Sequence, residues 1–198
     1  MTLDRSLEKF ESQQFENEDL SYEEFNEKRF VECLFTNCNF TETTFFKCGF
    51  VDCRFHDCTL GMIKLDGCTF SNTHFEASSL RGVNWSAVST PEIRLYCPVT
   101  FSNCMLDYAS FFGMNLKQTR IHGCMARNAD FREADLSEAD LTHTDFTDSE
   151  FDQTNLTGAD LRDAKNYRID VTRNKIKKAH FSMPEAMSLL YMLGIDIN

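Results

Sequence analysis

Between Asn128 and Leu161 the chain repeats with a period of five residues. Every fifth residue from Phe131 to Leu161 is Phe or Leu, and the residue two places before each of them is Ala, Ser or Thr. A polar residue stands between the small and the large one, and two mostly polar residues follow. An amphipathic helix needs apolar spacings of three and four, and a half-buried strand needs unbroken alternation, so neither accounts for this segment. The repeat itself therefore determines the fold.

The same register runs through most of the chain. A large residue occupies every fifth position from Phe30 to Trp85, and the series resumes at Phe101. Seventeen of the 19 Phe belong to it. We expect the two exceptions, Phe46 and Phe112, to point outward, where they could contact a partner.

Eight of the nine cysteines stand at the small position of the unit, and Cys97 is the exception. A zinc site at Cys48, Cys53 and Cys58 is the alternative to core packing, but zinc needs converging ligands, whereas a five-residue spacing places these cysteines on successive faces. Free cysteine packs as a small apolar side chain, so core packing is favoured and no metal site is predicted. The cysteines assigned to the core are Cys33, Cys38, Cys48, Cys53, Cys58, Cys68, Cys104 and Cys124.

The units NADF, EADL, HTDF, DSEF, QTNL and GADL, which lie between Asn128 and Leu161, resemble the pentapeptide-repeat family. The resemblance implies an all-β fold: a right-handed, four-sided β-helix, or solenoid, with four pentapeptides in each coil. It also implies that residues twenty positions apart stack, such as Cys33 under Cys53. We expect residues 1–198 to form a single solenoid domain.

The N-terminal segment matches only half of the repeat. The large positions from Phe10 to Phe30 keep the register, but the small positions hold long polar residues such as Glu18 and Lys28. Burying such groups without partners is costly, so we predict an irregular cap over about residues 1–28. A short helix is the less favoured alternative, because the Phe spacing does not follow 3.6 residues.

Residues 86–100 break the register. A large residue is due at Thr100 but occurs at Phe101, and two prolines favour an interruption of regular pairing. Two interpretations remain open: a bulge without a role, or a loop that contacts a partner. The second interpretation assigns contacts to Pro91, Glu92, Arg94 and Tyr96.

The composition changes again at the C-terminal end. The segment SMPEAMSLLYMLG predicts a helix with Ser182 as N-cap, Glu185 completing a capping box and Gly194 at its end. Together with an extended tail, it would cover the end of the solenoid over residues 182–198. Its remaining apolar side chains could pair two molecules. The residues assigned to this dimer interface are Leu189, Leu190, Leu193 and Ile195.

The formal net charge of −11 argues against direct binding to nucleic-acid phosphates and favours a basic partner. The charge is uneven: residues 1–85 and 126–165 each carry −7, residues 86–125 carry +1 and residues 166–198 carry +2. Carboxylates stacked one strand spacing apart repel, so they serve solubility or a partner, unless they belong to the repeat and serve its turns. The side chains assigned to an acidic partner-binding face are Asp130, Asp135, Asp140, Asp145, Glu150 and Asp160.

Several classes of protein are disfavoured by the residues. No basic segment followed by an apolar run opens the chain, and no apolar run could span a bilayer, so we expect a cytoplasmic protein. The five histidines fall on outward positions, and no glycine-rich phosphate loop or convergent catalytic set is visible. We predict no catalytic residues and no cofactor.

Within the family, the chain resembles the quinolone-resistance type and the related microcin-immunity proteins, on its nearly full-length repeat, its single break and its terminal NKIKKAHFSMPEAMSLLYMLGIDI. The resemblance implies a non-enzymatic rod that is similar to duplex DNA in shape and charge, binds DNA gyrase or topoisomerase IV, protects it from drugs or toxins, and forms a homodimer through its C-terminal ends. The break is shorter than the long loops of the plasmid-borne type, which argues against strong drug protection. The alternative is a structural scaffold that binds another protein and is acidic for solubility.

Overall fold

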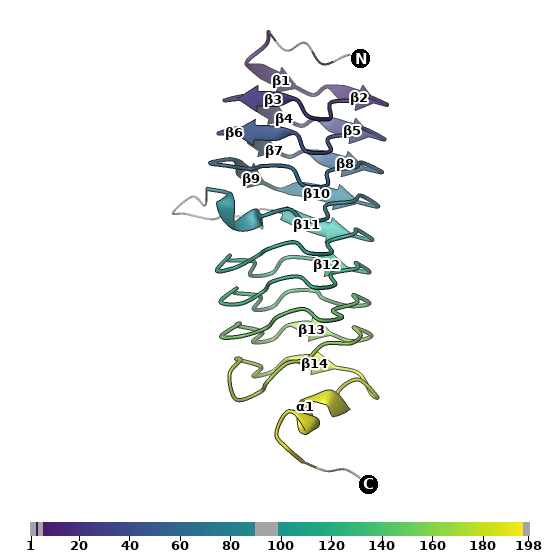
Figure 1. The fold of residues 1–198 in the computed structure, drawn as a ribbon, viewed down its shortest axis with the longest axis vertical. Helices are drawn as coiled ribbons and strands as arrows, with labels where there is room; N and C mark the ends of the chain where they lie inside the picture. The colour runs from purple at the N-terminus through teal and green to yellow at the C-terminus, as the bar shows by residue number, and fades with distance from the viewer. Residues whose placement is uncertain (1–2, 4–5, 90–98, 196–198) are drawn as a thin grey trace.

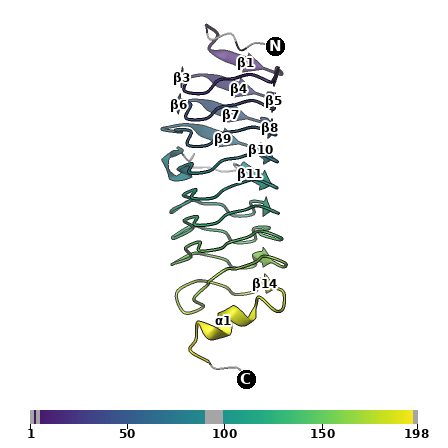
Figure 2. The same cartoon turned by 45° about the vertical axis from the view of Figure 1, so that its right-hand side comes forward.

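The computed structural model describes residues 3, 6–89 and 99–195 and shows a rod of stacked coils, a β-solenoid of about eight turns (Figures 1 and 2). Each regular coil takes twenty residues, because Phe10 pairs with Phe30 and Phe30 with Phe50 in parallel register. The coil has four short sides, so the rod has four faces. Faces 1 to 4 are those whose large inward residues in the first coil are Phe10, Phe15, Leu20 and Phe25, respectively.

Most sides of a coil are too short to form more than a two- or three-residue strand. Face 2 carries the longest sheet, with strand order β12-β11-β10-β8-β5-β2, and face 1 carries β1-β4-β7-β9. Elsewhere single bridges such as Asp130–Glu150 continue the ladder. The elements are β1 (Lys9–Glu11), β2 (Gln14–Glu16), β3 (Glu24–Asn26), β4 (Arg29–Val31), β5 (Leu34–Thr36), β6 (Thr44–Phe46), β7 (Gly49–Val51), β8 (Arg54–His56), β9 (Thr69–Ser71), β10 (Thr73–Glu76), η1 (Trp85–Ala87), β11 (Val99–Ser102), β12 (Ile121–His122), β13 (Asp160–Leu161), β14 (His180–Phe181) and α1 (Met187–Tyr191).

The core consists of the small and the large residue of each unit, as the repeat predicts. Large residues stack along each face: the ring centroids of Phe35 and Phe55 lie 4.6 Å apart at 10°, while Phe30 meets Phe35 on the adjacent face edge-on. The eight cysteines assigned to the core are buried and free, which confirms that prediction. Their thiols donate to backbone carbonyls, as Cys53 Sγ does to Phe30 O at 3.5 Å.

The corner of each unit lies two residues after the large one and has a left-handed backbone, for example Asn37 with φ 51° and Asp57 with φ 52°. Asn, Asp and Gly adopt this conformation at low cost. Corner side chains also bond from coil to coil: Asn37 Nδ2 donates to Asn17 Oδ1 at 2.6 Å, and Asn72 Nδ2 donates to Asp52 Oδ1 at 2.6 Å. The polar half of the repeat therefore has a structural role.

The irregular N-terminal cap predicted for residues 1–28 is wrong from Lys9 onward. Strands β1 and β2 pair in register with β4 and β5, and Phe10 stacks on Phe30 at 4.8 Å. The long polar side chains at the small positions do not need to enter the core, because this coil ends the stack. Glu8 is exposed, and the other residues at these small positions are only partly buried: Gln13, Glu18, Glu23 and Lys28.

The register break is an insertion of six residues. Thr73 pairs with Val99 and Ser79 with Met105, so one coil has 26 residues instead of twenty, which accounts for the frame shift of one. The coil leaves face 4 through η1, and Ser89 N still donates to Cys68 O on face 1 at 2.8 Å. The four residues predicted as loop contacts lie outside the described residues, as does Cys97.

A buried carboxylate joins the coils on either side of the insertion. The Asp107 side chain is 2% exposed and accepts hydrogen bonds from Arg127 Nε at 3.0 Å and Arg127 Nη2 at 2.9 Å. Arg81, on the preceding coil, lies 3.0 Å from the same carboxylate. The hydrogen bonds from Arg127 hold the pKa of Asp107 below its ordinary value. This clamp ties three successive coils together on face 3.

The C-terminal helix is shorter than predicted. It spans Met187–Tyr191, and its N-cap residue Ala186 makes no side-chain capping bond. Ser182 does not cap it, because the Ser182 hydroxyl accepts a hydrogen bond from Asp163 N at 3.1 Å instead. Gly194 has φ +69° and follows the last turn, so the predicted stop is confirmed.

The stacked core makes a prediction about two phenylalanines. Phe55 is 2% exposed and stacks on both Phe35 and Phe75, whereas Phe112 is 41% exposed. Phe55→Ala should lower the free energy of unfolding by about 3–5 kcal/mol. Phe112→Ala should lower it by less than about 1 kcal/mol. Urea denaturation measures both, and equal losses would contradict this arrangement of the core.

The clamp makes a prediction about pH. Because the pKa of Asp107 is lowered in the folded state, its stabilisation is full above the unfolded pKa of about 3.9 and is lost as pH falls through the folded pKa. Asp107→Asn should cost about 1–2 kcal/mol at pH 7, a modest figure because both arginines are about half exposed. The gap between wild type and variant should shrink below pH 4 in urea melts. A gap independent of pH would refute the ionic clamp.

Candidate partner-binding surfaces

The six acidic residues assigned to a partner-binding face do not share a face. Asp135 lies on face 1, Asp145 on face 3, and the remaining four lie on faces 2 and 4. The stacking predicted for the latter is confirmed: Asp130 bridges to Glu150 on face 4, and Asp140 bridges to Asp160 on face 2. These carboxylates therefore surround the rod.

Arginines neutralise both stacked pairs. On face 4, Arg132 lies 2.8 Å from Asp130 and 3.0 Å from Glu150. On face 2, Arg162 lies 2.6 Å from Asp160. The hydrogen bond from each arginine lowers the pKa of its aspartate, so Asp130 and Asp160 remain ionised well below neutral pH. In each pair, one aspartate is thus compensated by an arginine of its own repeat unit.

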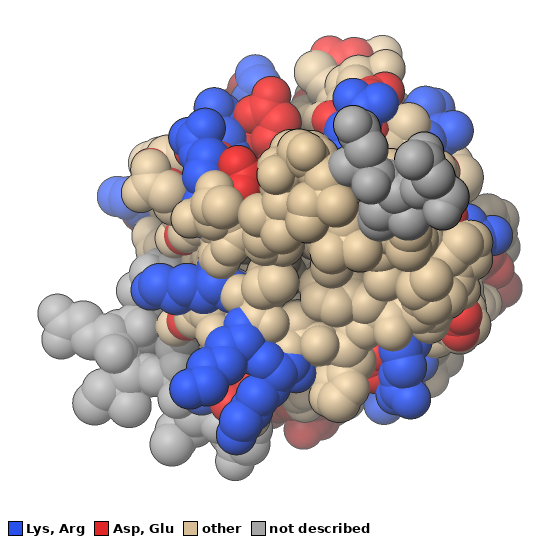
Figure 3. Space-filling model, turned by 90° about the horizontal axis from the view of Figure 1, so that it is seen from below, with Lys and Arg blue, Asp and Glu red and all other residues tan. Residues whose placement is uncertain are grey.

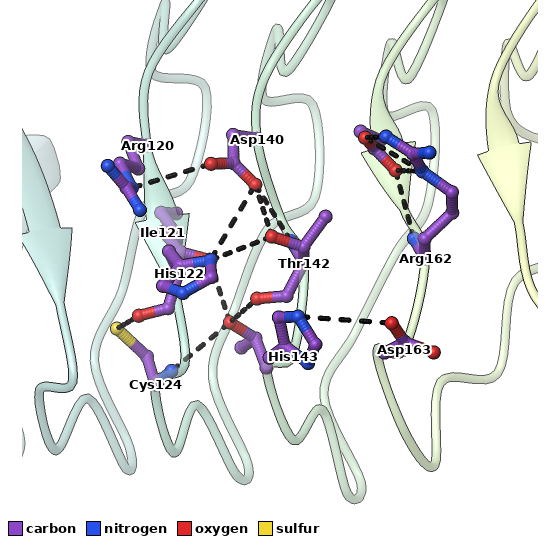
Figure 4. A network of polar contacts seen from close by, with 11 residues as sticks. Arg120, Ile121, His122, Cys124, Asp140, Thr142, His143, Arg162 and Asp163 are labelled. Atoms are coloured by element: carbon purple, nitrogen blue, oxygen red, sulfur yellow. Dashed lines mark hydrogen bonds and ion pairs between the residues drawn. The ribbon is translucent and has the colours of Figure 1, made fainter.

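Figure 4 shows the same compensation on face 2 as part of a wider polar network. Arg120 Nε lies 3.4 Å from Asp140 Oδ2, and His122 Nδ1 lies 2.7 Å from Thr142 Oγ1. His143 Nε2 lies 3.8 Å from Asp163 Oδ2 at the adjoining corner. This part of face 2 is polar, but its acidic and basic groups are nearly balanced.

Asp135 and Asp145 have structural partners but no ion pair among the described residues. Asp135 Oδ1 accepts from Ser137 N at 2.9 Å and from Asn155 Nδ2 at 3.0 Å. Asp145 Oδ1 accepts from Thr147 Oγ1 at 2.6 Å. These two aspartates therefore serve the turns of the repeat, as the turn-forming interpretation of the acidic positions predicted. Their charges still remain available to a partner.

Several carboxylates, three of them exposed, lie around the lower half of face 4. Glu133 and Asp148 lie at its two corners, are exposed, and make no ion pair within the described part of the chain. Glu150 and Asp152 lie between them on the face, where Arg173 Nη2 contacts Asp152 at 2.7 Å. We call these four carboxylates, together with Asp130, the face 4 acidic cluster. Glu133 and Asp148 are not among the acidic residues assigned from the sequence, because their position beside face 4 depends on the coil length.

The first coil is the most acidic part of the rod. Residues 8–27 contain eight carboxylates and a single lysine, so this coil alone carries −7. The sequence pattern predicts a cap here and assigns these residues to no site. The composition of this segment shows the excess of carboxylates, but it does not show that a regular coil carries them.

The C-terminal end is uncharged at its centre, and Lys and Arg side chains border much of it, with some Asp and Glu side chains among them (Figure 3). Leu190, Leu193 and Ile195 are 38%, 45% and 46% exposed, whereas Leu189 packs partly against the core. The last coil supplies basic residues, which include Lys175, Lys177, Lys178, Arg168 and Arg173.

Among the described residues, no helix has both the length and the apolar character that a membrane span requires. No group of three or more His, Cys, Asp or Glu side chains is arranged there to hold a metal ion.

Comparisons with known proteins place the repeat in a family. The family model for a pentapeptide repeat region matches residues 8–85, and the model for eight copies of pentapeptide repeats matches residues 127–163. No curated protein matches the sequence.

Solved structures share the fold. A trypsin-treated QnrB1, described as a plasmid-mediated fluoroquinolone resistance protein, superposes with TM-score 0.66 and 22% identity over 96% of this chain and 92% of that chain. A second trypsin-treated QnrB1 gives TM-score 0.64 and 19% identity, over 96% and 100% of the two chains. HetL of the cyanobacterium Nostoc sp., involved in heterocyst differentiation regulation, gives TM-score 0.53 and 13% identity, over 87% and 84%.

Proposed function

Because this chain belongs to the pentapeptide-repeat family, we propose that it is a DNA-mimicking, non-enzymatic protein that binds a type II topoisomerase, DNA gyrase or topoisomerase IV. In this proposal it acts in the cytoplasm and protects the enzyme from quinolones or toxins. The observation that carries the proposal is the rod itself, with exposed carboxylates on its first coil and around face 4.

The charge of the rod is compatible with partial mimicry of a duplex. About eight coils at a strand spacing of about 4.8 Å make a rod of roughly 38 Å. Duplex DNA of that length carries about 22 phosphate charges, at one per 1.7 Å. A net charge of −11 is half of this. A basic DNA-binding surface would therefore be steered toward the rod, with weaker electrostatic attraction than toward DNA.

The fold shared with QnrB1 supports a partner of this kind. QnrB1 is a fluoroquinolone resistance protein, and its likeness to this chain covers nearly all of both chains. Gyrase and topoisomerase IV, the targets of quinolones, have the basic DNA-binding surfaces that a mimic needs.

A structural scaffold for another protein is the competing function, and one observation favours it. Arg120, Arg132 and Arg162 neutralise carboxylates that a duplex mimic would leave free. The two functions differ in their response to salt. A charge-driven complex weakens steeply as ionic strength rises, whereas a scaffold contact based on shape does not.

A supercoiling assay tests the proposed function. With purified gyrase and ciprofloxacin, micromolar protein should either inhibit supercoiling or restore it in the presence of the drug. The effect should fade between 50 and 200 mM salt if it is electrostatic. Neither inhibition nor rescue under any of these conditions would refute topoisomerase binding.

Paired charge variants locate the contact. Glu133→Gln with Asp148→Asn removes two unpaired charges beside face 4 and should weaken binding about fivefold or more. The matched control, Asp140→Asn with Asp160→Asn, removes two charges that face 2 arginines already compensate and should change binding less than twofold. Affinity is measured by surface plasmon resonance on immobilised gyrase. Equal losses would mean that net charge, and not face 4, determines binding.

We further propose that the C-terminal ends pair two molecules into a homodimer through Leu189, Leu190, Leu193 and Ile195. The apolar centre with its basic border supports this arrangement, because pairing would bury the leucines and bring like charges together at the rim. The repulsion should make the dimer stronger at high salt.

Light scattering tests the dimer. Leu190→Glu or Leu193→Glu should produce a monomer with an unchanged circular dichroism spectrum, because both side chains are exposed in the single chain. The wild-type protein should shift further toward the dimer in 0.5 M NaCl. An unchanged mass in both variants would refute this interface.

A further inference from the structure

Face 2 contains a hollow of about 520 Å³ in the upper half of the rod. It extends across β5, β8, β10, β11 and the residue before β12, which belong to one continuous sheet. The side chains that matter below are Leu34, Arg54, His56, His74, Thr100 and Arg120.

The insertion after Trp85 shapes this hollow. Because the coil is six residues longer, His74 is paired with Thr100, and Glu76 with Ser102. Two short hydroxyl side chains therefore face outward between the longer residues of the coils above and below. The sheet between them forms the floor, and Leu34 forms an apolar wall at one end.

The walls of the hollow are held in place. His74 Nδ1 lies 2.7 Å from Thr100 Oγ1, and His56 lies 3.1 Å from Asp57 and 3.6 Å from Glu76. Each imidazole therefore has a polar contact with a neighbouring side chain. The positions of the two imidazoles are thus set before any ligand enters.

The charge of the hollow has the opposite sign to that of the rod. Arg54 makes no ion pair within the described residues. Arg120 lies 3.4 Å from Asp140, and its side chain is about half exposed to solvent. Glu76 is the only carboxylate in the lining, and it already faces His56. Two guanidinium groups therefore line a partly apolar hollow on a protein of net charge −11.

We propose that this hollow binds a small organic anion, of the class of aromatic carboxylates. Its volume falls within the range of about 300–1,000 Å³ that is typical of small-molecule sites, which combine apolar walls with a few convergent polar groups. Arg54 would receive the carboxylate in the bidentate geometry that guanidinium favours. The aromatic body would lie along the sheet beside His74, over the short side chains Thr100 and Ser102. The hollow lies on another face than the face 4 acidic cluster, and the proposal does not rest on topoisomerase binding.

Isothermal titration with 2-naphthoate tests the site, with the neutral 2-naphthylmethanol as the comparison ligand. Naphthoate should bind with one site per chain, and the alcohol should bind at least tenfold more weakly. Arg54→Gln should weaken naphthoate binding at least fivefold. Arg29→Gln is the matched control, because Arg29 also stands directly before a buried Phe, on face 1 and outside the hollow, and it should leave the affinity unchanged.

A second variant and a second readout separate the hollow from the apolar C-terminal end. Ser102→Trp fills the hollow without a change of charge and should abolish binding, while the ring signals of His74 should shift on titration of the wild-type protein with naphthoate. Failure of naphthoate to bind, equal affinities of the two arginine variants, or binding that survives Ser102→Trp with His74 unmoved would each overturn the proposal.

Discussion

The stacking of a large residue on its equivalent in the next coil is the constraint on which the rest of this structure depends. Parallel strands lie about 4.8 Å apart, and the Phe rings of successive coils lie 4.6 to 5.4 Å apart with nearly parallel planes. Rings and backbone therefore share one repeat distance, so neither has to stretch for the other. The interior then has room only for one large and one small side chain per unit. The outward side chains do not pack in the core, so their charge can vary without a change of the fold.

The same registry creates the main electrostatic problem of the rod. An outward carboxylate stacks on whatever stands twenty residues away, and Asp130 meets Glu150 while Asp140 meets Asp160. The chain resolves both cases with an arginine on the other side of the large residue, as in the segments DFR and DLR. There Arg132 and Arg162 turn back to Asp130 and Asp160. Where no such arginine stands, as at Asp135 and Asp145, amide or hydroxyl groups serve the carboxylate instead.

The core could be predicted from the sequence because each of its residues is specified within one unit of five. The buried cysteines, the Phe columns and the outward Phe46 and Phe112 all follow from that short pattern. Features that depend on the end of the stack could not be predicted from the sequence. Glu18 stands at a small position and indicated an irregular cap, but a terminal coil has solvent on one side and accommodates this side chain within a regular coil. Likewise, Ser182 has the spacing of an N-cap but bonds to Asp163 on the preceding coil.

Features that depend on the neighbouring coil were also beyond the sequence. The frame shift showed that something was inserted, but only the pairing of Thr73 with Val99 shows that it is six residues. The regular ladder still joins the coils across the insertion, because β10 pairs with β11 and Phe75 stacks on Phe101 with ring centroids 5.4 Å apart. Specific contacts reinforce it: Arg81, Asp107 and Arg127 on face 3, and His74 with Thr100 on face 2.

These contacts decide how the two ends of the rod are related. If the coils could turn against one another at the insertion, the acidic first coil and the face 4 acidic cluster would not keep a fixed spacing, and a rigid basic surface could not engage both at once. A carboxylate that is 2% exposed and held by two arginines fixes the coils before and after the insertion on one face. The parallel strands β10 and β11 fix them on the next. The rod therefore presents its two acidic regions as one rigid pattern across the insertion.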